Sequence, residues 1–181
     1  MAISLAYLGP PGTNSETAAL AYARILADTT DEEIILLPCP SIAQTIQAVA
    51  TKEANLAVAP VENSTEGSVT ITLDTLWQLE QLKIQQELVL PIPHVFLSRG
   101  TSLQGIHTVY SHPQALAQCQ RWIAHFLPKV KLIPTNSTTE ALSLINQDPT
   151  SAAIASPRAA KLYDLPVLAT NINDYPDNCT R

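Results

Sequence analysis

Short apolar runs alternate with helix-start signals along most of this chain, and this alternation limits the possible folds more than any other feature. Most runs are followed within a few residues by Ser, Thr, Asn or Pro, the residue types that begin helices. Strands that are joined through helices run parallel, with right-handed crossovers. We therefore predict an α/β fold built on parallel sheet. The expected strands are residues 3–8, 34–37, 56–59, 107–111, 131–133, 151–156 and 165–168.

Residues 84–97 interrupt this alternation. The stretch is extended in character, contains prolines at positions 91 and 93, and is too long for a single strand. Because 181 residues are enough for two small lobes, we interpret it as the crossing into a second lobe. The last residues, 171–181, are polar and rich in turn formers, which indicates either a chain cut at a domain edge or a frayed tail.

Composition and charge argue against several classes of function. The net charge of −6 and the pI of about 5.1 disfavour nucleic-acid binding, which selects basic surfaces. The first basic residue is Arg24, so the start lacks the charged region of a secretion signal, and no apolar run is long enough to span a membrane. Cys39, Cys119 and Cys179 are odd in number and far apart, and the histidines lack metal-ligand spacing. We expect free thiols in a reducing cytoplasm and no bound metal.

A polar segment directly after the third expected strand is the main candidate for a ligand site. Glu62, Asn63 and Ser64 stand there with no Lys or Arg beside them, and Ser68 can cap a helix that starts near Val69. In an open α/β sheet, ligands bind at the carboxyl ends of strands, beside helix N-termini. The segment is therefore either a ligand site presented by the strand or a solvated loop between a strand and a helix.

A second candidate follows the first expected strand, at the Gly-Pro-Pro-Gly segment of residues 9–12. Thr13 and Ser15 come next and are candidate caps for a helix, whose free N–H groups attract an anion. The segment is superficially like a phosphate-binding loop, but the lysine of that motif is absent, which argues against nucleotide binding. What remains is either a seat for a small anion or a plain capped helix.

A third set of polar side chains follows the fourth expected strand. Ser111 lies at the carboxyl end of that strand, and a single amphipathic helix is expected over 113–126. Gln114 and Gln118 lie one turn apart on this helix, either as ligand contacts or as surface residues. His94, within the extended stretch, is more typical of a core histidine than of a catalyst.

Taken together and in order, these motifs resemble the catalytic domain of prephenate dehydratases over almost the full length of the chain. Each motif is weak alone, whereas the ordered set is specific. Position 14 is Asn where the family usually has Phe, and the chain ends where a Phe normally follows Arg181. The regulatory ACT domain, which binds phenylalanine in the family, is absent, so we expect a catalytic domain on its own. The matching segments are residues 7–10, 12–13, 15–16, 60, 62–64, 67, 110–119, 137–141, 152–156, 178 and 180–181.

The resemblance implies a fold similar to the type II periplasmic binding proteins, with two α/β lobes and the active site in the interlobe cleft. We expect lobe 1 to comprise about residues 1–79 and 171–181, and lobe 2 about residues 80–170. The final segment then returns to the first lobe and places Thr180 at the hinge side of the cleft.

The resemblance also implies an activity, the decarboxylating dehydration of prephenate to phenylpyruvate in L-phenylalanine biosynthesis. Aromatisation of the ring drives the loss of carbon dioxide and water, so no cofactor is expected. The leaving hydroxide needs a proton or a strong donor, and the ring carboxylate loses carbon dioxide more readily in a dry site. Besides prephenate, the expected partners are further copies of the chain in a homo-oligomer, with phenylalanine acting only through the missing ACT domain.

The same resemblance assigns roles to particular side chains. Thr180 is the expected donor to the leaving hydroxyl, and Glu62 is the alternative acid if it is buried. Arg181 is expected to pair with a carboxylate, either of the protein or of the substrate. The other expected substrate contacts are Thr13, Ser15, Asn63 and Ser64 in the first lobe and Ser111, His112, Gln114 and Gln118 in the second.

Three other functions stay open at this level. An arogenate dehydratase performs the same chemistry on the transaminated side chain. A non-catalytic module that binds a small anion shares the two-lobed fold, although such modules usually carry a secretion signal. An effector-binding domain of a transcription regulator is the third, although it normally carries a basic helix-turn-helix.

Overall fold

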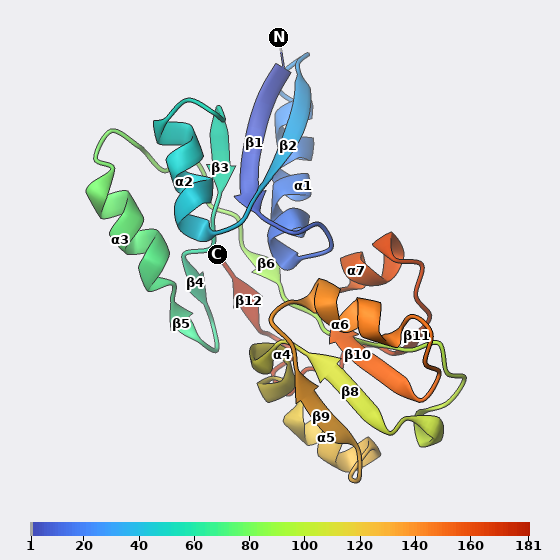
Figure 1. Ribbon diagram of the computed structural model, residues 1–181. Helices are drawn as coiled ribbons and strands as arrows, with labels where there is room; N and C mark the ends of the chain where they lie inside the picture. Colours follow the sequence, from blue (N-terminus) through green and yellow to red (C-terminus); the bar gives the residue numbers. More distant parts are fainter. Residues whose placement is uncertain (1) are drawn as a thin grey trace. The chain divides into compact units, whose positions relative to one another are not determined.

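The computed structural model describes residues 2–181, apart from the side chains of Thr138 and Thr139. The described chain divides into two compact units (Figure 1). The first comprises the chain up to Pro91 together with Asn178–Arg181, and the second is Ile92–Asp177. Each unit is described by itself below.

The centre of the first unit is a parallel sheet around β1 (Ala2–Leu8). This strand lies between β2 (Glu33–Cys39) and β3 (Leu56–Val58), and Leu5 is paired with Leu36 on one side and Leu56 on the other. Because successive side chains of a strand point to opposite faces, β1 builds two small cores, and Figure 1 shows a helix on each side of it.

The two helices that cover this sheet are α1 (Asn14–Ala27) and α2 (Ile42–Ala50). The buried side chains on the α1 face include Leu5, Tyr7 and Ala19, whereas those on the α2 face include Ala6, Cys39 and Ala48. Both helices begin at a hydroxyl cap, and Thr13 is the cap that the sequence predicts for α1. Thr13 Oγ1 accepts from Glu16 N at 3.2 Å, and Ser41 Oγ accepts from Gln44 N at 3.2 Å.

The polar segment after β3 forms a hairpin, not the strand-to-helix loop or helix cap that the sequence predicts. Strands β4 (Glu62–Asn63) and β5 (Gly67–Ser68) pair antiparallel, and Gly67 has φ +85°, a left-handed conformation that glycine adopts at little cost. Ser68 belongs to this pairing, and α3 (Thr70–Gln78) has Val69 at its N-cap position, with no side-chain cap.

The hairpin is completed by two strands from distant parts of the chain. Strand β12 (Cys179–Thr180) lies between β4 and β6 (Leu90–Pro91), and all neighbours are antiparallel. This pairing explains why the first unit extends to Pro91 and not to the expected boundary near residue 79. It also explains why only the last four residues, and not all of 171–181, belong to it.

The second unit is built on a sheet with the strand order β11-β7-β10-β8-β9. Strands β8, β9 and β10 run parallel, whereas β7 is antiparallel to both of its neighbours. The sheet is therefore mixed, which differs from the wholly parallel sheet that the sequence predicts. The strands are β7 (Val95–Leu97), β8 (Thr108–Ser111), β9 (Lys131–Pro134), β10 (Ser151–Ala155) and β11 (Val167–Ala169).

Helices cover both faces of this sheet. Leu97 and Ala153 face a core that includes Ala141 and Leu142 of α6 (Thr138–Ile145), whereas Phe96 and Ile154 face a core that includes Ile123 of α5 (Gln120–Phe126). The helices are α4 (Pro113–Ala117), α5 (Gln120–Phe126), α6 (Thr138–Ile145) and α7 (Pro157–Leu162), with a 3-10 turn, η1, at Leu103–Gly105. None of the described helices is both long enough and apolar enough to cross a membrane.

The single helix expected over 113–126 is two helices that break at Gln118 and Cys119. Cys119 has φ −126° and ψ 15°, which are not helical values. Asp174 holds the break open, because its N–H donates to the Gln118 carbonyl at 2.7 Å and its carboxylate accepts from the Arg121 N–H at 3.0 Å. The carboxylate thus caps the second helix from a segment that is remote in sequence.

Candidate functional site

Asn63 and Thr180 form the best-defined pair of polar side chains in the first unit. Asn63 Oδ1 accepts from Thr65 N at 3.0 Å, from Thr65 Oγ1 at 2.7 Å and from Glu66 N at 3.2 Å. Backbone N–H groups only donate, so these contacts identify the oxygen end of the amide. The nitrogen end, Nδ2, then donates to Thr180 Oγ1 at 2.8 Å.

This arrangement leaves the Thr180 hydroxyl as a directed donor. Its oxygen accepts from Asn63, and the described residues offer no acceptor for its hydrogen. Asn63 is buried and Thr180 is half-buried, so the pair is partly shielded from water. A hydroxyl that accepts a hydrogen bond is polarised and becomes a better donor to a third group.

Ser64 uses its hydroxyl within the protein. Ser64 Oγ donates to Asn178 Oδ1 at 3.0 Å and accepts from Cys179 N at 3.0 Å. Asn178 Oδ1 also accepts from Thr65 Oγ1 at 3.3 Å, and Asn178 is 3% exposed. These bonds hold β12 beside the hairpin. Sequence reasoning gave Asn178 no role, although its place two residues before Thr180 was the available signal.

Glu62 and Arg181 contact each other through a backbone hydrogen bond, not through their side chains. Arg181 N donates to the Glu62 carbonyl at 2.9 Å, and the side chain of Glu62 is exposed. The Arg181 guanidinium lies 3.4 Å from a carboxylate oxygen of Glu87, with both side chains more than half exposed. Arg181 was expected to pair with a carboxylate of either the protein or the substrate, and this contact is with the protein. An exposed ion pair of this kind contributes little stability.

The N-terminus of α1 is satisfied largely by the protein itself. Thr13 Oγ1 accepts from Glu16 N and donates to the Leu8 carbonyl at 3.4 Å. The buried carboxylate of Glu16 accepts from Gly12 N at 2.8 Å. The Glu16 carboxylate therefore occupies one of the N–H groups that were expected to bind an anion. Ser15, in the first turn of the helix, is half-buried.

The predicted residues of the second unit fall into two groups. Ser111 is fully buried and donates to the Ile154 carbonyl at 2.7 Å, and His112 accepts from Gln114 N at 3.3 Å as the cap of α4. Gln114 is exposed. Gln118 is buried, and its side chain bonds to His94 at 2.9 Å. Burial lowers the pKa of His94, an effect that the Gln118 hydrogen bond partly opposes.

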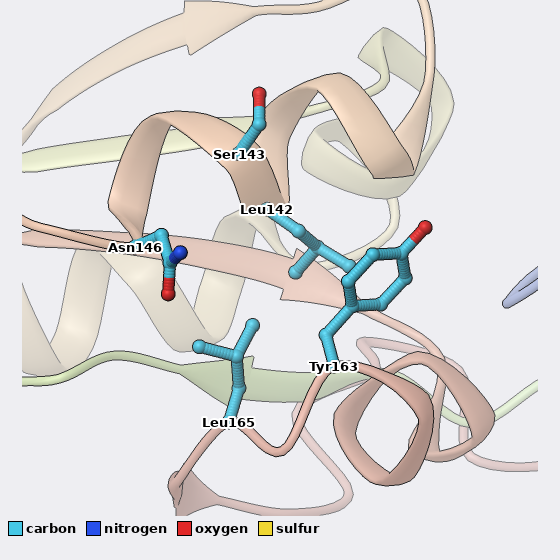
Figure 2. Close-up of a pocket in the computed structure, with 5 residues that line it drawn as sticks. All are labelled: Leu142, Ser143, Asn146, Tyr163 and Leu165. Carbon is cyan, nitrogen blue, oxygen red and sulfur yellow. The ribbon is translucent and has the colours of Figure 1, made fainter.

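A pocket of about 200 Å³ lies between α6, α7 and the segment that leads to β11 (Figure 2). Figure 2 shows Leu142, Leu165 and the Tyr163 ring around it, with Ser143 and Asn146 at its margin. None of the predicted site residues lines this pocket. Within residues 2–181, no group of three or more His, Cys, Asp or Glu side chains is placed to hold a metal ion.

A family model described as prephenate dehydratase matches residues 5–181. The bifunctional chorismate mutase/prephenate dehydratase of Aquifex aeolicus is 41% identical over 179 residues, which are 99% of this chain and 47% of that protein. The prephenate dehydratase of Lactococcus lactis subsp. cremoris is 35% identical over 181 residues, which are 99% of this chain and 62% of that protein. The chain thus spans less than two thirds of the length of these relatives.

Solved structures are similar over nearly the whole chain. Prephenate dehydratase from Arthrobacter aurescens, in complex with L-Phe, has a TM-score of 0.82 and 35% identity, over 98% of this chain and 57% of that one. GqqA, described as a novel type of quorum quenching acylase, has a TM-score of 0.74 and 28% identity, over 98% and 61%. The methionine-binding protein MetQ has a TM-score of 0.54 and 11% identity, over 98% and 81%. MetQ shows the fold alone, that of the type II periplasmic binding proteins, which confirms the predicted fold class.

Proposed function

This chain belongs to the prephenate dehydratase family, and from this premise we propose that it converts prephenate to phenylpyruvate with release of carbon dioxide and water, a step in phenylalanine biosynthesis. The observation that carries the proposal is the Asn63–Thr180 pair, in which a neutral hydroxyl is held as a directed donor. The reaction needs such a donor at the oxygen that leaves.

The bonds that change define what the protein has to supply. The bond between the ring and its carboxylate breaks, and the electron pair of that bond enters the ring. The carbon–oxygen bond on the opposite side of the ring breaks, and the oxygen leaves as water once it has received a proton. Because the ring becomes aromatic, the driving force lies in the substrate, and the protein needs to supply orientation, a donor and a dry surface.

Thr180 is the proposed donor to the leaving oxygen. A threonine hydroxyl is too weak an acid to lose its proton outright, so it acts as a strong hydrogen-bond donor or relays a proton as the carbon–oxygen bond lengthens. The hydrogen bond from Asn63 Nδ2 fixes the orientation of the hydroxyl and polarises it. Donors aimed at developing negative charge are among the largest contributions to catalysis.

Glu62 is the alternative proton donor, and its exposed side chain lacks the burial that this role requires. The substitution Glu62→Gln removes the acid and keeps a hydrogen-bond donor. We expect the variant to keep the shape of the pH–rate profile, because Thr180 supplies the donor. Loss of one limb of that profile would show that Glu62 is the proton donor.

Gln118, Ser111, His112 and Gln114 are proposed to contact the substrate from the second unit, and Thr13, Ser15 and Ser64 from the first. The support differs between them. Gln118 is a buried amide that bonds to His94, and the hydroxyls of Thr13, Ser64 and Ser111 also bond to the protein, whereas Gln114 is exposed. The expected interlobe cleft, homo-oligomer and cytoplasmic location stay predictions.

Incubation of the purified chain with prephenate tests the proposal, with phenylpyruvate followed by its ultraviolet absorbance and corrected for the uncatalysed reaction. Arogenate and an N-acyl amide are tested in parallel. Turnover of prephenate supports the proposal, and faster turnover of arogenate would favour the arogenate dehydratase. Binding of prephenate in calorimetry without turnover would indicate a binding module, and cleavage of the amide alone would indicate an acylase.

A further inference from the structure

The start of β12 is joined to the hairpin by a side chain in place of a backbone carbonyl. Because Thr180 is paired with Asn63 in antiparallel strands, Cys179 comes opposite Ser64. Ser64 N donates to the Cys179 carbonyl at 2.9 Å. In a regular antiparallel ladder the Cys179 N–H would donate back to the Ser64 carbonyl. It donates instead to Ser64 Oγ, at 3.0 Å.

A hydroxyl can rotate, unlike a backbone carbonyl, and the side chain of Asn178 fixes the direction of this one. Ser64 Oγ donates its hydrogen to Asn178 Oδ1 at 3.0 Å, which leaves a lone pair for the Cys179 N–H. Asn178 is 3% exposed, and its Oδ1 also accepts from Thr65 Oγ1 at 3.3 Å. Because burial of an amide is costly unless the amide is hydrogen-bonded, the value of Asn178 at this position lies in its polar contacts.

Asn178 and Thr180 hold the same short strand against the hairpin. They are two residues apart, a spacing that places side chains on the same face of an extended chain. Asn178 contacts the hairpin through Ser64, and Thr180 contacts it through Asn63 at 2.8 Å. Since β12 is only two residues long, few backbone hydrogen bonds set its position, and the side-chain contact at its start has a large share in it.

We infer that Asn178 is a positioning residue for the proposed reaction. It acts through the Ser64 hydroxyl on the Cys179 N–H, and so fixes where β12 presents the Thr180 hydroxyl to Asn63. Asn178 does not itself touch the substrate. The inference rests on the proposed function, in which Thr180 is the donor. A displacement of about 1 Å at a reacting group can cost about 100-fold in rate, so the placement of this strand matters for kcat.

The test compares two substitutions of Asn178. Asn178→Leu removes the oxygen that accepts from Ser64, whereas Asn178→Asp keeps an oxygen there and gives up the NH₂ group. At a temperature well below the Tm of every variant, we expect Asn178→Leu to lower kcat for prephenate about tenfold, with KM changed much less. We expect Asn178→Asp to recover at least half of that loss on a logarithmic scale.

A double-mutant cycle with Thr180→Ala separates positioning from general stability. If Asn178 acts on Thr180, Asn178→Leu has no further effect on kcat once Thr180 is Ala, although it still lowers Tm. Asn178→Ala takes its place in the same cycle if Asn178→Leu does not fold. Additive losses in kcat, or equal losses in Asn178→Leu and Asn178→Asp, would overturn the inference. A wild-type chain that does not turn over prephenate would instead contradict the proposed function.

Discussion

Asn63 and Thr180 show how one side-chain contact sets the chemistry of its neighbour. The Asn63 amide accepts from the turn that follows it, so the nitrogen end has to meet Thr180. The hydroxyl of Thr180 then has its oxygen occupied and its hydrogen available to a ligand. Two substitutions test this direction of hydrogen bonding.

Thr180→Ala removes the proposed donor without changing the backbone pairing of β12. We expect kcat to fall about 100-fold, the usual cost of losing one donor to developing charge, with KM changed much less. Thr180→Ser keeps the hydroxyl and is the matched control, expected to retain most of kcat. Initial rates over a range of prephenate concentrations give both constants. An unchanged kcat in Thr180→Ala would remove Thr180 from the reaction.

Asn63→Asp reverses the contact while the side chain keeps its shape. One oxygen still accepts from the turn, whereas the other now accepts the hydrogen of Thr180 and withdraws it from the substrate. We expect kcat to fall about as far as in Thr180→Ala, by about 100-fold. Ser68→Asp adds the same charge on the exposed neighbouring strand and is expected to stay close to wild type. Equal losses in both variants would show that charge alone is responsible.

The hairpin of β4 and β5 is the element that carries Asn63, and its turn depends on the conformation of Gly67. The φ of +85° is unfavourable for side chains, but a Cβ there would meet no atom within 4 Å. The cost of a substitution is therefore confined to the backbone.

We expect Gly67→Ala to lower the free energy of unfolding by about 1–2 kcal/mol, the cost of a left-handed conformation for an L-residue. Gly67→Asn should lose less, because Asn tolerates this conformation better. Urea denaturation of the three proteins measures the difference. Equal losses in Ala and Asn would point to a cause other than φ.

The whole molecule consists of two units that each have their own buried cores. In the second unit, His94 links the stability of the fold to pH. Burial lowers the pKa of His94 below the ordinary value of 6.5. As the pH falls below 6.5, the unfolded chain takes up a proton that the folded chain does not, so the stability present above pH 6.5 is progressively lost.

We expect Tm to fall between about pH 7 and about pH 5 more steeply in the wild type than in His94→Gln, which has no imidazole to protonate. Differential scanning calorimetry at several pH values within this interval checks the difference in slope. Parallel slopes would show that other groups cause the pH dependence.

Much of the fold could be predicted because its signals are local. The caps at Thr13, Ser41 and Ser137 act within three residues of their partners, and the apolar alternation of β1 reflects the two faces of one strand. The α/β class, these helix starts and membership of the family were therefore within reach of the sequence.

Only the tertiary structure decided how remote segments complete these elements. Asn63 meets Thr180 across 117 positions of sequence, and Asp174 breaks the helix at Gln118 from more than 50 positions away. Such hydrogen bonds depend on which remote segment packs beside a helix or strand, and local propensities do not specify that packing. The sequence by itself thus determined the helix starts, the fold class and the candidate side chains. The tertiary structure determined which of those side chains are donors, which are acceptors, and which form their hydrogen bonds with other groups of the protein.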